Sequence, residues 1–185
     1  MTGATDIEWR PTPSEVRAKG RRVEGYVATF GSVADLGGGL TETIQPGAFR
    51  EALQNQGDIL ALMDHDMSSV LGRTRSGSLT LKEDEKGLAF SLELPNTQAG
   101  NDALALAERG DLGGMSFGFH VPKGGDTWEG TKRTLNKVDL REVSIVSAIP
   151  AYPDTTIALR HYRHIADSQT RLRVLVLAEM EHWGS

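Results

Sequence analysis

The segment Gly113–Phe119 alternates large apolar side chains with small ones, which is the pattern of a β-strand whose two faces differ. Its methionine and two phenylalanines would face a core, whereas Ser116 and Gly118 would face the opposite side. The glycines two positions before and after this serine leave room for a substrate to approach its hydroxyl. The alternative is that Ser116 is only the polar side of a half-exposed strand.

Most of the chain carries the same strand-like patterning, and helical spacing is confined to a few segments. Strands are predicted at 23–30, 59–63, 70–74, 78–82, 88–94, 114–119 and 138–149. Helical spacing occurs at 47–53, at 99–109 and from 162 to 183. This distribution predicts a mainly β (α+β) fold: a small antiparallel β-barrel surrounded by a few helices, with a C-terminal helix.

Composition divides the chain into three parts. Residues 1–20 are polar and contain Pro11 and Pro13, so they are expected to form a loose N-terminal arm or a weak first helix. Residues 21–160 hold the predicted strands and form the main domain. Residues 161–185 are expected to form a helical tail.

The composition also excludes several classes of protein. The chain has no cysteine, which removes disulfides, thiolate metal sites and a cysteine nucleophile. A formal net charge of −5 without a basic stripe argues against a nucleic-acid partner. The sequence has no apolar run of membrane-spanning length and no signal-peptide pattern, so a cytoplasmic protein without a membrane partner is expected.

A histidine that could activate Ser116 follows the strand predicted at 59–63. His65 lies between two aspartates in a polar turn, and the ends of strands commonly present functional groups. An imidazole titrates near neutral pH, so it can take the serine proton and return it to a leaving amine. The rival base, His120, stands about 13 Å from Ser116 along the same strand. A surface histidine in a tight turn remains the alternative for His65.

An acid that could orient His65 lies in the predicted strand 138–149. Glu142 is the best candidate, because an acid within such a strand is either paired or turned outward. Asp139 and Asp66 are the alternatives for this role. A salt bridge with a neighbouring strand or simple solvent exposure would equally explain Glu142.

The same region admits a metal site as a competing interpretation. Asp64, His65 and Asp66 could ligate a divalent ion, with His120 or Asp139 completing the shell. The spacing matches no specific metal-binding motif. The favoured interpretation is therefore a serine hydrolase that uses Ser116, His65 and Glu142.

Six groups of residues, in this order, resemble a known family. They are Val23–Phe30, Ile44–Phe49, Leu62–Asp66 with Val70–Arg73, Gly114–Phe119, Leu140–Val146 and Pro150–Pro153. Over roughly residues 23–160 the chain resembles the prohead maturation proteases of tailed bacteriophages, which are related in fold to the herpesvirus capsid-assembly protease (assemblin).

The resemblance implies roles for individual residues. Ser116 would be the nucleophile and His65 the general base, and Glu142 would occupy the place of a second histidine in the herpesvirus relatives. The oxyanion donors are unassigned, with a backbone N–H in 147–152 as a candidate. The family's small β-barrel surrounded by helices agrees with the fold predicted from the patterning.

The implied function is a serine endopeptidase without a cofactor, acting inside the immature capsid in the host cytoplasm. Its substrates would be the scaffold protein, or the scaffolding segment of the major capsid protein, and the protease itself. The tail 161–185 would serve in packaging or in forming a homodimer or higher oligomer. The alternative is a non-catalytic capsid scaffold or assembly module, to which the acidic charge and the C-terminal helix would also be suited.

Overall fold

The structure is a computed structural model that describes residues 7–12, 14, 16–55 and 57–147. In chain order, the strands are β1 (Glu8–Thr12), β2 (Arg17–Lys19), β3 (Arg22–Thr29), β4 (Ala34–Gly37), β5 (Leu40–Ile44), β6 (Leu60–Met63), β7 (Asp66–Arg73), β8 (Leu79–Glu83), β9 (Gly87–Glu93), β10 (Gly114–His120), β11 (Asp126–Glu129), β12 (Lys132–Leu135) and β13 (Asp139–Val146). Two helices accompany them, α1 (Arg50–Gln54) and α2 (Gln98–Arg109). The mainly β class is confirmed.

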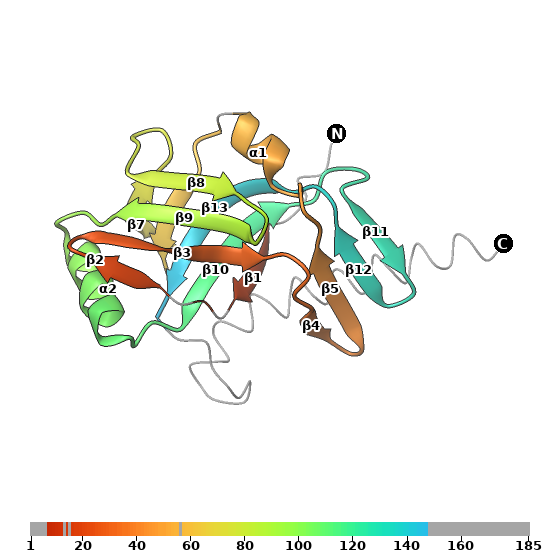
Figure 1. Ribbon diagram of the computed structural model, residues 1–185, viewed down its shortest axis with the longest axis horizontal. Coiled ribbons are helices and arrows are strands. Elements are labelled where there is room, and N and C mark those ends of the chain that lie inside the picture. Colours follow the sequence, from red (N-terminus) through yellow and green to blue (C-terminus); the bar gives the residue numbers. More distant parts are fainter. Residues whose placement is uncertain (1–6, 13, 15, 56, 148–185) are drawn as a thin grey trace.

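Within the described residues the strands form three open sheets (Figure 1). Their orders are β1-β10-β13-β6-β7, β11-β12-β5-β4 and β2-β3-β9-β8. Most pairs are antiparallel, but β13 runs parallel to β6, and β12 runs parallel to β5. None of these sheets pairs its two edge strands, so the expected barrel is not confirmed. The alternation of residues predicts which side chains share a face of a strand. It does not predict which strands pair with one another, because strand pairing depends on contacts between segments far apart in the sequence.

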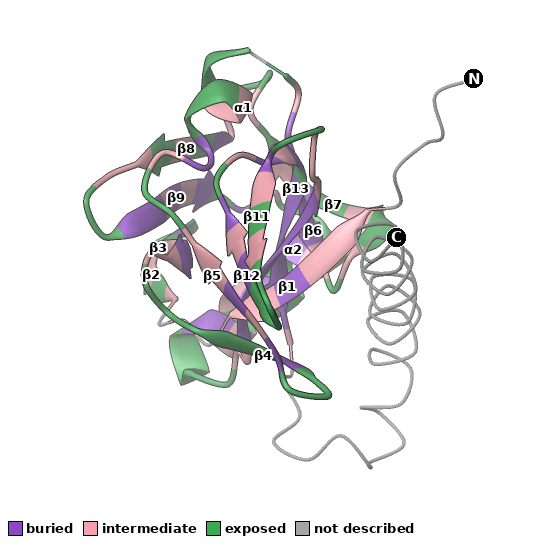
Figure 2. Ribbon diagram, turned by 90° about the vertical axis from the view of Figure 1, so that its right-hand side faces the viewer, coloured by how far each residue is buried: buried purple, intermediate pink, exposed green. Residues whose placement is uncertain are grey.

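The core lies between the five-stranded sheet and the sheet β2-β3-β9-β8. Phe117 and Phe119 of β10 stack with their ring centroids 5.0 Å apart, and both are fully buried. Phe49, just before α1, meets Phe117 edge-on at 5.6 Å. Figure 2 shows β13 and β6 deep in the molecule, whereas β4 is largely exposed. Because the phenylalanines of β10 face this core, the intervening Ser116 faces away from it.

The N-terminal segment differs from the expected loose arm or helix, because residues 8–12 and 17–19 form strands. β1 pairs with β10 along its whole length, and Pro11 lies opposite Ser116. Proline is tolerated there because β1 is an edge strand. Arg10 turns to the other face, where its guanidinium pairs with Glu42 of β5 at 2.6 Å. This distant partner cannot be inferred from the local pattern of residues 1–20.

Helix α2 matches the helix predicted at 99–109, and a capping residue stands at each of its ends. The Thr97 side chain accepts a hydrogen bond from the backbone N–H of Gly100, and Gly110 ends the helix in the left-handed conformation. The predicted C-terminal helix lies outside the described residues. Neither helix in the described part of the chain is both long and apolar enough to cross a lipid bilayer.

Candidate active site

The face of the five-stranded sheet opposite the core carries a cluster of polar side chains. In the antiparallel pairing of β10 with β13, Ser116 lies opposite Ser144, and Gly118 lies opposite Glu142. Residues directly opposite each other in such a pair point to the same face. The sheet therefore places Ser116, Ser144 and Glu142 together, on the side away from the buried phenylalanines.

His65 completes this cluster from the turn between β6 and β7. Its Nδ1 lies 2.7 Å from Oε1 of Glu142, and the two side chains are 15% and 7% exposed. Because a carboxylate oxygen accepts hydrogen bonds, Nδ1 is the donor when Glu142 is ionised. The other oxygen, Oε2, accepts a hydrogen bond of 2.6 Å from the Ser144 hydroxyl. Both carboxylate oxygens are thus engaged, and one of them orients the imidazole.

A glycine makes room for this carboxylate. A Cβ atom added at Gly118 would lie 2.5 Å from Oε1 of Glu142, far closer than van der Waals contact. The Glu142 side chain therefore lies directly over the backbone of β10. The absence of a side chain at Gly118 is a requirement of the His65–Glu142 contact.

The turn that presents His65 has an unusual backbone. Met63 pairs with Asp66, so Asp64 and His65 are the two residues of a tight hairpin loop. Their φ angles are +49° and +60°, and no other non-glycine residue in the described ranges has a positive φ. Positive φ at both central positions is typical of type I′ hairpin turns, where Asn-Gly and Asp-Gly are preferred. A histidine held in this conformation carries backbone strain.

Asp64 ties this turn to the end of β13. Its Oδ1 accepts a hydrogen bond of 2.8 Å from the backbone N–H of Ser147, and Oδ2 accepts one of 2.8 Å from the Ser147 hydroxyl. Its own backbone N–H donates to the carbonyl of Ile145 at 2.9 Å. Because the N–H of Ser147 is used in this way, it is not the oxyanion donor considered above, and residues 148–152 lie outside the described part of the chain.

Ser116 is 0% exposed, and its Oγ has no hydrogen-bond partner among the described residues. Leaving a buried polar group unsatisfied costs about 1–3 kcal/mol, so such groups are rare in folded proteins. Hydrogen bonds between catalytic groups commonly shorten only when a substrate is bound. The structure thus places Ser116 on the face of the His65–Glu142 pair, without a direct bond from its hydroxyl to a base.

The alternative acids bond elsewhere. Asp66 accepts hydrogen bonds from Ser68 and Ser69, and Asp139 pairs with Arg141. His120 lies opposite Asp139, at the far end of β10. With Asp64 on Ser147 and His65 on Glu142, the side chains of 64–66 do not converge on one point. No group of three potential metal ligands occurs in the portion of the chain that the structure describes.

Trp9 is a site residue that the sequence reasoning missed. Trp9 of β1 lies opposite Gly118, and its ring meets the His65 ring edge-on, with centroids 6.0 Å apart. Nothing in residues 1–20 signals this contact, because it depends on the pairing of β1 with β10. Ser144 could have been found, since two residues of separation put it on the face of Glu142 in a strand.

A buried ionic cluster fixes β1 in place. Arg10 and Arg133 share Glu42, and Arg133 also pairs with Glu8 and Asp126. Burial opposes the ionisation of Glu8, but hydrogen bonds and charge from Arg133 and Arg10 outweigh it and hold the pKa of this carboxyl below its ordinary value. The cluster connects β1 to the sheet β11-β12-β5-β4, and it therefore holds the strand that carries Trp9.

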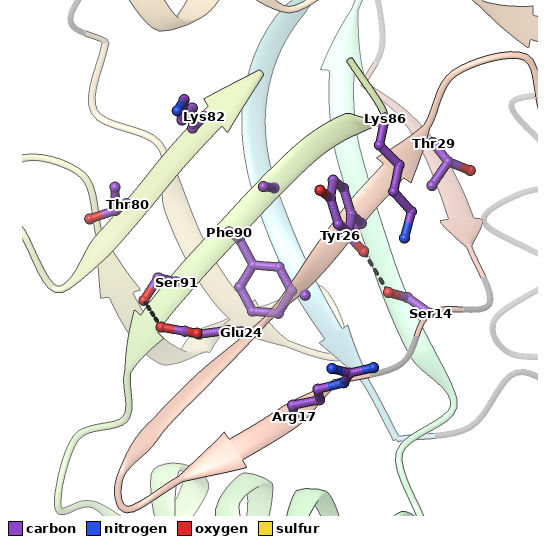
Figure 3. Close-up of a pocket in the computed structure, with 12 residues that line it drawn as sticks. Ser14, Arg17, Glu24, Tyr26, Thr29, Thr80, Lys82, Lys86, Phe90 and Ser91 are labelled. Carbon is purple, nitrogen blue, oxygen red and sulfur yellow. Dashed lines mark hydrogen bonds between the residues drawn. The ribbon is translucent and has the colours of Figure 1, made fainter. Parts of the chain in front are cut away.

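A hollow of about 640 Å³ lies on another sheet, over β3, β9 and β8 (Figure 3). The residues lining it are Ser14, Arg17, Glu24, Gly25, Tyr26, Thr29, Thr80, Lys82, Lys86, Ala89, Phe90 and Ser91. Several of them bond to one another, as Ser91 does to Glu24 and Ser14 to the carbonyl of Tyr26. None of His65, Ser116 and Glu142 lines it, so this hollow is separate from the candidate active site.

Comparisons with known proteins point to one family. The family described as Caudovirus prohead serine protease matches residues 11–169. The prohead protease of Enterobacteria phage HK97 is 34% identical over 137 residues, which are 73% of this chain and 58% of that protein. The chain therefore spans less than two thirds of the length of that relative.

One solved structure shares the fold. The structure of the bacteriophage T4 capsid assembly protease, gp21, aligns with a TM-score of 0.50 and 12% identity, over 76% of this chain and 95% of that chain. At this level of identity, the likeness concerns the fold alone.

Proposed function

Because the chain belongs to the caudovirus prohead serine protease family, we propose that it is a serine endopeptidase with Ser116 as nucleophile. His65 is the general base, and Glu142 orients it. The observation that carries this assignment is the 2.7 Å contact between His65 and Glu142, which lie 77 positions apart in the chain. A histidine paired with a carboxylate, on the sheet face of a buried serine, is the arrangement that nucleophilic acyl transfer needs.

The proposed reaction moves one proton along this arrangement. The Ser116 hydroxyl attacks the scissile carbonyl carbon while Nε2 of His65 accepts its proton, which gives a tetrahedral oxyanion and an imidazolium. The imidazolium delivers the proton to the leaving amine, the C–N bond breaks, and an ester to Ser116 remains. Water then hydrolyses the ester by the same proton path and restores the hydroxyl.

Glu142 acts through charge and orientation in this scheme. Its Oε1 accepts from Nδ1, so Nε2 is left as the basic nitrogen of the neutral imidazole. Its negative charge also stabilises the imidazolium that forms when Ser116 loses its proton. The hydrogen bond from Ser144 to Oε2 holds the carboxylate in the orientation that this role requires.

The proposed substrates are peptide bonds of capsid assembly. One observation supports this: the relative from phage HK97, which is 34% identical, is a prohead protease. We propose that the chain cleaves a scaffold protein or the scaffolding segment of the major capsid protein, and itself, inside the prohead in the host cytoplasm. Kinship in fold with the herpesvirus proteases and assembly into a homodimer or higher oligomer stay predictions.

Two measurements test the proposal. The chain is incubated with its major capsid protein and scaffold, and the cut sites are read by mass spectrometry. In parallel, a fluorophosphonate probe tests for a reactive serine. Ser116→Ala is expected to abolish cutting and labelling while its circular dichroism stays unchanged, and Ser91→Ala, on another sheet, should behave like the wild type. Full processing by Ser116→Ala would overturn the assignment, and an unreactive wild type that joins capsids stoichiometrically would indicate an assembly module.

A further inference from the structure

The hairpin that carries His65 is held in a conformation that its residues disfavour. Asp64 and His65 both have positive φ, which only a few per cent of non-glycine residues adopt, although Asn, Asp and His do so more often than the others. The second central position of such a turn favours glycine, and histidine lacks the conformational freedom of glycine. The conformation must therefore be maintained by contacts outside the turn.

The imidazole of His65 contacts Glu142 and Trp9, and the other residue of the turn, Asp64, supplies a second set of contacts. Both of its carboxylate oxygens accept hydrogen bonds from Ser147, one from the backbone and one from the hydroxyl, each at 2.8 Å. With the bond from the Asp64 N–H to Ile145, three hydrogen bonds fasten one residue of the turn to the end of β13. They extend the parallel pairing of β6 with β13, in which Met63 lies opposite Ile145.

The strand to which the turn is fastened is also the strand that holds Glu142. The contact of Asp64 with Ser147, at the end of β13, therefore helps to fix the distance between His65 and Glu142. From this geometry, we propose that Asp64 is a positioning residue: its contact with Ser147 keeps His65 in the left-handed conformation and its imidazole against Glu142. This inference rests on the proposed function, because the position of His65 matters for catalysis only if His65 is the base.

Asp66 provides a matched control on the other side of the histidine. It carries the same charge and is also adjacent to His65, but its carboxylate bonds to Ser68 and Ser69 within β7. A general effect of negative charge beside the imidazole would appear equally in variants of Asp64 and Asp66. A positioning effect would appear at Asp64 alone.

The variants separate the contact from the backbone conformation. Asp64→Asn keeps an acceptor for the Ser147 N–H and tolerates positive φ. Asp64→Gly tolerates positive φ but loses the contact, and Asp64→Ala loses both. We expect Asp64→Ala and Asp64→Gly to lower the rate of Ser116 labelling by a fluorophosphonate about 100-fold, as for a misplacement of about 1 Å. Asp64→Asn, Asp66→Asn and Asp66→Ala should stay within about 3-fold of the wild type, because none of them misplaces the imidazole.

A second readout follows the imidazole itself. A proton held between Nδ1 of His65 and a carboxylate gives a far-downfield proton resonance, and thermal melting is recorded beside it to verify folding. The resonance should disappear in Asp64→Ala and Asp64→Gly and persist in Asp64→Asn and both Asp66 variants. If Asp64→Ala does not fold, Ser147→Ala, which removes only the bond to Oδ2, should give a smaller loss in the same direction.

The outcomes distinguish the two proposals. If the wild type does not react with the probe, the proposed function fails, and the resonance still reports whether Asp64 holds His65. If the wild type reacts, and folded Asp64→Ala reacts at the same rate with the resonance intact, the positioning role is overturned. Equal losses in the Asp64 and Asp66 variants would also overturn it, in favour of an effect of charge.

Discussion

Oε1 of Glu142 lies 2.7 Å from Nδ1 of His65 and would lie 2.5 Å from a Cβ atom at position 118. One carboxylate oxygen thus contacts the histidine while resting on the backbone of the strand that carries Ser116. The His65 turn, β13 and β10 meet at this atom. The three segments are therefore structurally coupled, and substitutions of Glu142 and Gly118 test this coupling.

Replacing Glu142 by glutamine should preserve the shape of the site and remove its charge. We expect kcat to fall about 10³- to 10⁴-fold, because the amide can select the wrong imidazole tautomer and cannot balance an imidazolium. Cleavage kinetics on a capsid-protein peptide measure the loss, with Glu24→Gln on another sheet as control. The combination with Ser116→Ala should be scarcely worse than Ser116→Ala alone, and a large further loss would show that the residues work separately.

Gly118→Ala should displace the Glu142 carboxylate without removing any catalytic group. Overpacking of this kind costs about 1–3 kcal/mol of stability, and the imidazole would lose its acceptor at the same time. We expect a folded protein with strongly reduced kcat, measured beside urea unfolding. Gly57→Ala is the matched control, since a Cβ atom there meets nothing within 4 Å. Full activity of Gly118→Ala would mean that the carboxylate does not need its present position.

Glu42→Ala should be among the most destabilising single substitutions in the described residues. Glu42 is almost fully buried between Arg10 and Arg133, and its removal leaves two buried guanidinium groups short of a partner. Breaking a buried pair in this way costs about 3–5 kcal/mol. Glu93→Ala, which breaks the exposed pair with Arg22, should cost at most about 1 kcal/mol. Urea unfolding measures both, and equal losses would contradict this view of the cluster.

The same cluster predicts acid sensitivity. The pKa of Glu8 is held below its ordinary value of 4.5, so the folded state favours the ionised carboxylate. Its contribution is fully present above the unfolded-state pKa and is lost as pH falls through the lower folded-state pKa. The free energy of unfolding should therefore decrease below about pH 4.5, and the decrease should be shallower in Glu8→Gln. An identical pH profile for both proteins would exclude Glu8 as the cause.

The sequence predicted individual elements better than their partners. The alternation in Gly113–Phe119 correctly separated the core face from the face of Ser116, because side-chain direction in a strand is a local property. Helix α2 was equally predictable, since its capping residues are local signals. The strand character of residues 8–12 was missed, because β1 is held by pairing with β10 and by the bond from Arg10 to Glu42.

In the candidate site, too, the individual residues could be predicted, but their contacts could not. His65, Ser116 and Glu142 could be named from residue type, neighbouring pattern and family resemblance. Their spatial relation depends on the register in which Gly118 lies opposite Glu142, and register is set by pairing across the sheet. The contact of Asp64 with Ser147 was out of reach for the same reason, because it joins the ends of two strands that lie far apart in the sequence.

The position of β1 has a practical consequence for handling the protein. β1 is the edge strand that covers one side of β10. Trimming the chain past Thr12 would uncover a row of backbone amides and carbonyls on the strand that carries Ser116. An uncovered edge of this kind recruits other polypeptides by strand pairing. A shortened N-terminus should therefore promote self-association and precipitation, and purification tags are better attached ahead of Glu8 than substituted for the residues that follow it.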